Sequence, residues 1–146
     1  MKLQAIRLHD FSMGHRVIGE GPDNKCAHLH GHNYRVIFYC ESEQESDTDN
    51  SSGYVVNLSI VKEKLCMWVE DNYDHRMMIW DKDPILSKLQ ELEPDHIVSV
   101  PFKPSTENIA HHLLTVVGPL QLAGTGARLT KVEIIETMKC SSIAEI

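Results

Sequence analysis

An alternation of side chains from His30 to Cys40 predicts a long β-strand with one apolar face. Side chains at positions i and i+2 of a strand point to the same side, so one face carries His30, His32, Tyr34, Val36 and Phe38. The first two of these residues can offer two imidazole nitrogens to one point. Gly31 lies between them and leaves the backbone open to close approach.

This histidine pair suits Zn²⁺, which proteins bind mostly through histidine nitrogen or cysteine sulfur. A catalytic zinc has three protein ligands and one open position, so a third ligand is expected elsewhere. The best candidate is His15, in a segment from Leu3 to Val17 that also alternates and puts Phe11, Met13 and His15 on one face. The competing interpretation is a histidine-rich surface loop without metal. A nearby cysteine and a third strand histidine argue against it.

Cys26 lies four residues before His30, in a loop that follows the turn-forming residues 19–24. It could be a fourth zinc ligand, which would close the site and make it structural. Alternatively, the sulfur stays off the metal and serves as a thiolate base or nucleophile, its pKa lowered by the nearby cation or by a histidinium. The residues alone leave both interpretations open.

The chain has 146 residues, which fits one domain over 1–146. Its net charge of −7 argues against nucleic-acid binding, which requires clustered Lys and Arg. No apolar run approaches the ~20 residues that a membrane helix requires, and we see no signal peptide. Four cysteines at unrelated spacings (Cys26, Cys40, Cys66 and Cys140) do not form a disulfide framework, so we expect a reduced, cytoplasmic protein.

The rest of the chain predicts an α+β fold. A helix capped by Asn57 or Ser59 has the core-facing stripe Val61, Leu65, Trp68 and Val69, and it breaks at the polar turn 71–75. Further helices are expected from Asp83-Pro84 to Pro94, and from Pro104 to a terminator at Gly118-Pro119. Short strand-like pieces are expected at 53–56 and 96–100, and a closing strand or hairpin from about Arg128 to Thr137. The acidic, serine-rich segment 41–52 is expected to be a flexible hairpin tip.

Two carboxylates have unusual surroundings. Glu136 shares a face of the closing strand with Val132 and Ile134, where a carboxylate is costly unless it is paired or hydrogen-bonded. A structural ion pair and a functional role would both explain it. Asp74 precedes His75 in a turn, where a carboxylate can orient an imidazole for acid or base chemistry.

Five segments together resemble the 6-pyruvoyl-tetrahydropterin synthase family: Phe11–His15, Cys26–Tyr34, Asp74-His75, Ser105–Asn108 and Val132–Thr137. They occur in the family's order and cover nearly the whole chain. The three-residue gap between Cys26 and His30 resembles the bacterial branch, which makes 6-carboxy-5,6,7,8-tetrahydropterin in the queuosine pathway. Asn57-Leu58, by contrast, resembles the animal enzymes.

The resemblance implies the tunnelling fold, an antiparallel four-stranded sheet with two main helices on one face. Sheets from several subunits would join into a β-barrel, with active sites between subunits. We therefore expect a homo-oligomer, a hexamer built as a dimer of trimers. The substrate would be 7,8-dihydroneopterin triphosphate, and Arg16, Lys25, Arg35 or a neighbouring subunit would supply positive charge for its phosphates.

The resemblance also implies residue roles. Zn²⁺ would be held by His15, His30 and His32, and Cys26 would be the base that removes a proton. His75, supported by Asp74, would relay or donate protons. Glu136 would bind the pterin ring through the two N–H donors of its aminopyrimidinone edge.

Glu107 and Thr106, at a helix start, would add contacts to the ring, although Glu107 also has a sufficient helix-dipole explanation.

The expected products are 6-carboxytetrahydropterin, acetaldehyde and triphosphate. The alternative is 6-pyruvoyl-tetrahydropterin, formed by loss of triphosphate alone. A third interpretation is a zinc-stabilised oligomeric scaffold without catalysis, in which Cys26 closes the coordination sphere.

Overall fold

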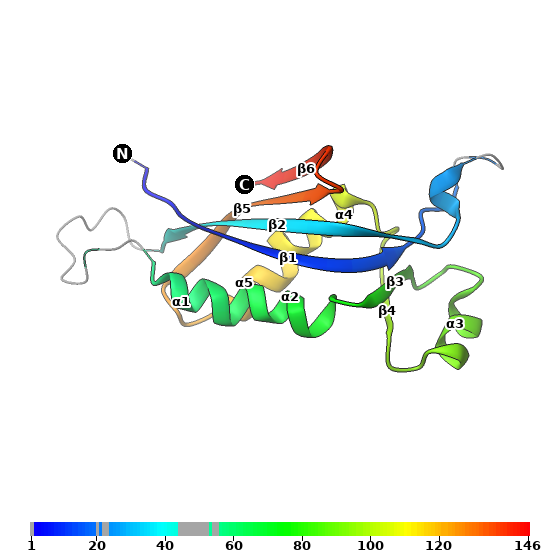
Figure 1. Ribbon diagram of the computed structural model, residues 1–146. Coiled ribbons are helices and arrows are strands. Elements are labelled where there is room, and N and C mark those ends of the chain that lie inside the picture. The colour runs from blue at the N-terminus through cyan, green and yellow to red at the C-terminus, as the bar shows by residue number, and fades with distance from the viewer. Residues whose placement is uncertain (1, 20, 22–23, 44–52, 54–55) are drawn as a thin grey trace.

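A computed structural model describes residues 2–19, 21, 24–43, 53 and 56–146. Its sheet has the spatial order β4-β3-β1-β2-β5-β6 (Figure 1). The strands are β1 (Ala5–His15), β2 (His30–Ser42), β3 (Arg76–Trp80), β4 (Ile97–Val100), β5 (Ala127–Glu136) and β6 (Cys140–Glu145). Strands β1, β2, β5 and β6 pair antiparallel, while β3 pairs parallel with both β1 and β4. The predicted α+β class is confirmed, but the sheet has six strands rather than four and is not wholly antiparallel.

The unpredicted strand β3 explains part of this difference. Its residues Met78 and Ile79 are adjacent and both fully buried. A strand buried on both sides lacks the alternation by which half-buried strands are predicted. It joins the edge of β1 at Met13 and in turn supports β4, so two short parallel strands extend the four antiparallel ones.

Two long helical segments cover one face of the sheet (Figure 1). The first consists of α1 (Leu58–Val61), the π-helical turn η2 (Lys62–Cys66) and α2 (Met67–Asn72), and the Asn57 side chain caps it by accepting from the Ser59 N–H. The second consists of α4 (Thr106–His112), the π-helical turn η3 (Leu113–Val117) and α5 (Gly118–Leu122). Shorter pieces are the 3₁₀ turn η1 (Lys25–Ala27) and α3 (Leu86–Leu92).

Gly118-Pro119 does not end the second helix, contrary to the prediction. The π-helical turn precedes it, and Pro119 lies in the first turn of α5, where a missing N–H is tolerated. The glycine instead serves packing, because a Cβ atom at position 118 would lie 2.5 Å from Cδ2 of Leu129. Gly118 therefore lets the helix approach β5 closely.

The predicted inward faces of the first two strands are confirmed. Phe11, Met13 and His15 of β1 are buried, as are Tyr34, Val36 and Phe38 of β2. They pack against the helix stripe Val61, Leu65 and Val69, with Trp68 only partly buried. The core thus lies between the helices and one face of the sheet, and the histidines stand at its end.

Some predictions fall wholly or partly outside the described residues. Glu41 and Ser42 end β2, and 44–52 of the expected hairpin tip lie outside the described part of the chain. In the expected strand 53–56, Gly53 and Val56 are described, and neither belongs to a strand. In the described residues, no helix is both long and apolar enough to cross a membrane.

Candidate metal centre and surrounding site

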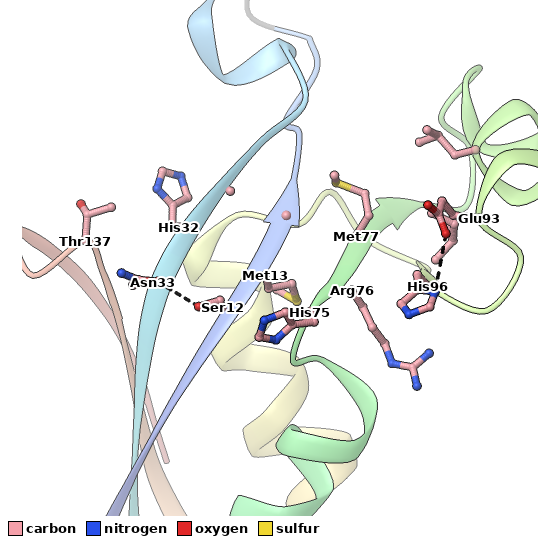
Figure 2. A pocket seen from close by; sticks show the side chains of 14 residues that line it. Ser12, Met13, His32, Asn33, His75, Arg76, Met77, Glu93, His96 and Thr137 are labelled. Atoms are coloured by element: carbon pink, nitrogen blue, oxygen red, sulfur yellow. Dashed lines mark hydrogen bonds and ion pairs between the residues drawn. The ribbon is translucent and has the colours of Figure 1, made fainter.

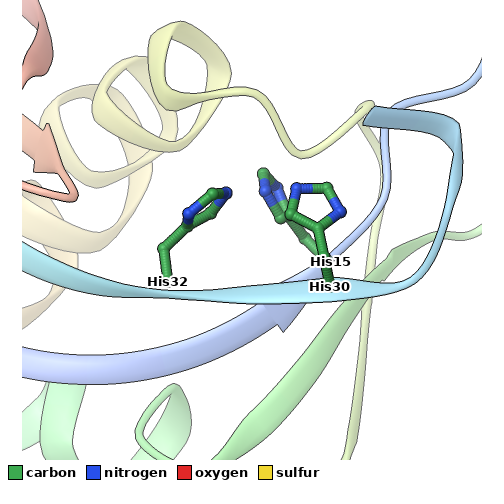
Figure 3. Close-up of side chains that lie close together, drawn as sticks. All are labelled: His15, His30 and His32. Carbon is green, nitrogen blue, oxygen red and sulfur yellow. The ribbon is translucent and has the colours of Figure 1, made fainter. Parts of the chain in front are cut away.

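Three imidazoles converge at the end of the β1–β2 hairpin (Figure 3). His15 and His30 are directly opposite each other in the last pair of the antiparallel register, and His32 lies two residues further along β2. Their ring centroids are 4.6 to 5.2 Å apart. One potential ligand atom from each residue lies within 4.8 Å of the other two. Within the described residues, this is the group of side chains that could hold a metal ion.

Backbone carbonyls orient two of the rings. Nδ1 of His15 lies 2.6 Å from the Pro104 carbonyl oxygen, and Nδ1 of His30 lies 2.6 Å from that of His28. A carbonyl oxygen can only accept, so each Nδ1 carries the proton and each Nε2 keeps its lone pair. Hydrogen bonds of this kind fix the tautomer of metal-binding histidines. Nε2 of His15 is buried and has no hydrogen-bond partner among the described residues.

The electrostatics favour the neutral form of His15 and His32. Burial lowers the pKa of His15 to about 4, with further lowering by His30 and His32 and some opposition from the Pro104 contact. Burial also lowers the pKa of His32, although the Glu136 carboxylate opposes the shift. Neutral imidazoles with buried, unpaired nitrogens are the form that binds metal, so this donor set fits Zn²⁺.

Glu136 adjoins the cluster from β5. Its Oε1 lies 3.0 Å from Nε2 of His32, a close contact that lacks hydrogen-bond geometry. It points to the same side as Val132 and Ile134, both fully buried, as the alternation predicts. Directly across the β2–β5 pair stands Tyr34. The carboxylate thus lies at the border of the core and the histidines.

Glu107 and Thr106 begin α4, two residues after the Pro104 carbonyl that holds His15. Oε1 of Glu107 accepts a hydrogen bond of 2.8 Å from the Ser142 hydroxyl of β6, and the Thr106 hydroxyl lies 2.6 Å from the same Ser142 oxygen. The Ser142 hydrogen bond holds the pKa of Glu107 below its ordinary value. This network fixes a carboxylate on the side of the sheet that carries Glu136.

Cys26 is exposed in η1, and its carbonyl accepts a hydrogen bond of 2.7 Å from the Val17 N–H. This bond ties the loop to the residues that directly follow His15. Its sulfur does not belong to the group of candidate metal ligands found among the described residues.

Asp74 and His75 form the dyad that the sequence suggested, but they do not join the three histidines. Oδ2 of Asp74 lies 2.6 Å from Nδ1 of His75, and Oδ1 accepts a 2.9 Å hydrogen bond from the Ser12 N–H. Partial burial raises the pKa of Asp74, but the hydrogen bonds from Ser12 and His75 outweigh this effect and leave the pKa below its ordinary value. His75 has a left-handed backbone (φ 60°) and a side chain that is 79% exposed.

His75 lines a groove of about 830 Å³ whose lining also includes Ser12, Gly14, Asn33 and His32 (Figure 2). Ser12 and Gly14 alternate with the buried Met13 and His15, so they point away from the helices. Asp74 and His75 bond to the backbone of Ser12, whose side chain points away from the helices, whereas His15 lies on the helix side.

Sequence reasoning missed the carbonyls of Pro104 and His28, since any residue supplies a carbonyl. It also assigned no role to Ser142, which lies far from Glu107 in the chain. Sequence alone cannot reveal such partners, because only the β5–β6 hairpin brings Ser142 to the helix start.

The fold and the site together define an α+β protein of the tunnelling-fold class with a three-histidine candidate metal centre. The family model described as 6-pyruvoyl tetrahydropterin synthase matches residues 5–145, so the chain belongs to that family.

Relatives and solved structures agree with this assignment. A protein of Rickettsia bellii named 6-carboxy-5,6,7,8-tetrahydropterin synthase is 29% identical over 94% of this chain and 96% of its own length. One of the same name from Aquifex aeolicus is 31% identical over 75% of each chain. The 6-pyruvoyl tetrahydropterin synthase of Caenorhabditis elegans has a TM-score of 0.69 at 25% identity, covering 99% of this chain and 95% of that one. An uncharacterized protein of Wolinella succinogenes shows the same fold with a TM-score of 0.80 at 23% identity, covering 99% and 98%.

Proposed function

We propose that this protein is a zinc-dependent lyase that converts 7,8-dihydroneopterin triphosphate and water to 6-carboxytetrahydropterin, acetaldehyde and triphosphate in the queuosine pathway. The observation that carries the proposal is the convergence of His15, His30 and His32, in which Nε2 of His15 and of His32 is buried and makes no hydrogen bond among the described residues. The names of the Rickettsia and Aquifex relatives support this product. The reduced cysteines agree with a cytoplasmic enzyme.

The three imidazoles would hold Zn²⁺, which as a Lewis acid polarises substrate oxygens and acidifies the adjacent C–H. Glu136 binds the aminopyrimidinone edge of the pterin, because two carboxylate oxygens match two neighbouring N–H donors. Glu107, oriented by Ser142, adds a second contact to the ring, and Thr106 lines the same helix start.

Cys26 removes a proton from the substrate, and the hydrogen bond from the Val17 N–H to its carbonyl, two residues after His15, supports this role. His75, held by Asp74, returns or relays protons. Because this dyad bonds to the backbone of Ser12 and does not join the three histidines, we assign it to the site of a neighbouring subunit. The enzyme is therefore a homo-oligomer with shared active sites, and we propose a hexamer built as a dimer of trimers.

The triphosphate requires free positive charge. Arg16 already forms a two-pronged ion pair with Asp83, and Arg35 pairs with Asp10. Lys25, next to Cys26, forms no ion pair among the described residues. We therefore assign phosphate binding to Lys25, together with groups from a neighbouring subunit.

A test of the product separates this proposal from its nearest rival. Purified zinc-loaded protein is given 7,8-dihydroneopterin triphosphate, and acetaldehyde, triphosphate and pterin products are measured. The proposal expects acetaldehyde and 6-carboxytetrahydropterin in equal amounts. Triphosphate release with 6-pyruvoyl-tetrahydropterin and no acetaldehyde would instead support the alternative synthase, and no turnover of any kind would support the zinc-stabilised scaffold.

A further inference from the structure

Two buried tyrosine hydroxyls lack hydrogen-bond partners among the described residues, those of Tyr34 and Tyr73. Tyr34 is 2% exposed and Tyr73 is 1% exposed, so bulk water does not reach either side chain freely. A buried hydroxyl without a partner costs folding free energy, and phenylalanine would fill the same space without that cost. Each hydroxyl therefore needs an explanation beyond packing.

The surroundings of Tyr34 point to the metal centre. Its ring stacks on Phe11 at 5.2 Å and lies 6.0 Å from the His15 ring and 5.7 Å from the His32 ring, between centroids. Across the β2–β5 pair it stands directly opposite Glu136. Opposed residues on one face of an antiparallel pair have Cβ atoms about 5 Å apart, so a carboxylate can reach its cross-strand neighbour. Tyr73 contacts Phe11 and Trp68 instead.

Glu136 now contacts Nε2 of His32, at 3.0 Å without hydrogen-bond geometry. An ion bound by the three histidines needs a lone pair from His32, and coordination through Nε2 would take the nitrogen that the carboxylate touches. The carboxylate must then turn away. An unpaired donor on the same face is the hydroxyl of Tyr34, the residue directly opposite Glu136 in the strand pair.

We propose that Tyr34 is a positioning residue whose hydroxyl becomes the hydrogen-bond partner of Glu136 when metal occupies the three histidines. The inference rests on the proposed metal site and deepens it. The tyrosine donates to one lone pair of the carboxylate and fixes its orientation, and the remaining lone pairs accept from the N–H groups of a pterin. The Tyr34 hydroxyl, which has no hydrogen-bond partner among the described residues, thus gains one in the metal-loaded protein.

The first test is spectroscopic and needs no substrate. Zn²⁺ is added to metal-free wild-type protein, and the tyrosine ultraviolet difference spectrum is recorded. We expect a change that disappears in Tyr34→Phe and persists in Tyr73→Phe, the matched control with an equally buried, unpaired hydroxyl. Glu136→Gln is expected to diminish it. An identical spectrum change in wild-type and Tyr34→Phe protein would overturn the inference.

The second test measures binding of neopterin, which lacks the triphosphate, to zinc-loaded protein. Because a hydrogen bond to a charged group contributes about 1.5–3 kcal/mol, Tyr34→Phe should weaken binding about tenfold or more. In the Tyr34→Phe variant, a second substitution Glu136→Gln should reduce neopterin affinity less than Glu136→Gln does in the wild type. The reason is that Tyr34 acts through Glu136. Tyr73→Phe should bind like wild type. Wild-type affinity in Tyr34→Phe would contradict the proposal. A double variant whose loss of affinity equals the product of the two single losses would contradict it as well.

The metal-free melting temperature of Tyr34→Phe provides the folding control, and it is expected to equal or exceed that of wild type because an unpaired hydroxyl has been removed. A clear fall would show that the hydroxyl already has a partner without metal, which would also overturn the inference. Product identity does not enter these readouts. An absence of acetaldehyde would defeat the lyase assignment and leave the Tyr34 inference standing.

Discussion

The Nδ1 atom of His15 lies 2.6 Å from the carbonyl oxygen of Pro104, a residue 89 positions further along the chain. This bond joins the end of β1 to the residue that precedes the Ser105 cap of α4. The imidazole of His15 is therefore oriented by the loop that leads directly into Thr106 and Glu107. One hydrogen bond thus links a proposed metal ligand to the loop before the proposed ring-binding residues.

Replacing His15 by alanine should abolish stoichiometric zinc binding. Two imidazoles would remain of a three-ligand set, and a cavity would replace a side chain that is only 3% exposed. Zinc per chain after dialysis is the measurement. His28→Ala is the control, because His28 is exposed and orients His30 through its carbonyl, which alanine retains. Equal zinc in wild type and His15→Ala would contradict the metal assignment.

Cys26→Ala should keep one zinc per chain and lose turnover. The sulfur lies outside the candidate ligand group of the described residues, and the proposal makes it the base. Zinc content and acetaldehyde release are measured on the same sample. Cys140→Ala, which removes another exposed thiol, should retain turnover. If the Cys26→Ala variant also loses its zinc, the thiol is a ligand and the result supports the scaffold interpretation.

Mixing two inactive variants tests whether active sites are shared between subunits. Cys26→Ala and His75→Ala are unfolded together, refolded with zinc and assayed. If Cys26 of one subunit works with His75 of another, about a quarter of the sites in a random mixture regain both groups. If both groups act within one chain, every site keeps one defect and activity stays absent. Each variant refolded alone gives the baseline.

The Arg16–Asp83 pair should give the fold an acid-sensitive contribution. Asp83 is only 5% exposed, and Arg16 donates to it at 2.7 and 2.5 Å. The Arg16 hydrogen bonds, despite opposition from burial, hold the pKa of Asp83 below its ordinary 3.8. The stabilisation is therefore complete above about pH 4 and is lost as the pH falls through the lowered pKa.

Urea unfolding of metal-free protein measures this effect. Asp83→Asn should lower the free energy of unfolding by about 2–3 kcal/mol at pH 7, because Arg16 loses its charged partner. The difference from wild type should shrink below pH 4. Asp10→Asn, which breaks the exposed pair with Arg35, should change little. A difference for Asp83→Asn that is constant with pH would count against this account.

Sequence alone predicted the parts of the molecule where one periodicity dominates. The inward faces of β1 and β2 followed from alternation, and with them the approach of His15, His30 and His32. Strand β3 was not predicted because Met78 and Ile79 are both buried, so its sequence does not alternate between apolar and polar residues. The continuation of the helix through Gly118 was not predicted, because a Gly-Pro pair favours a helix end. The helix continues there because Gly118 packs closely on Leu129.

The position of the Asp74–His75 dyad could not be predicted from residue type. The left-handed backbone of His75 and the hydrogen bonds of both residues to Ser12 set which side of the sheet it faces. These features depend on β3 joining β1 in parallel, a long-range pairing that no local pattern encodes.

The connection 16–29 leaves the sheet at His15 and returns at His30, the two residues of the final strand pair. Insertions or deletions inside it would move Cys26 without disturbing the pairing that aligns the imidazoles. A lineage with this hairpin can lengthen or shorten the segment that carries its thiol while the three proposed metal ligands keep their places on the sheet.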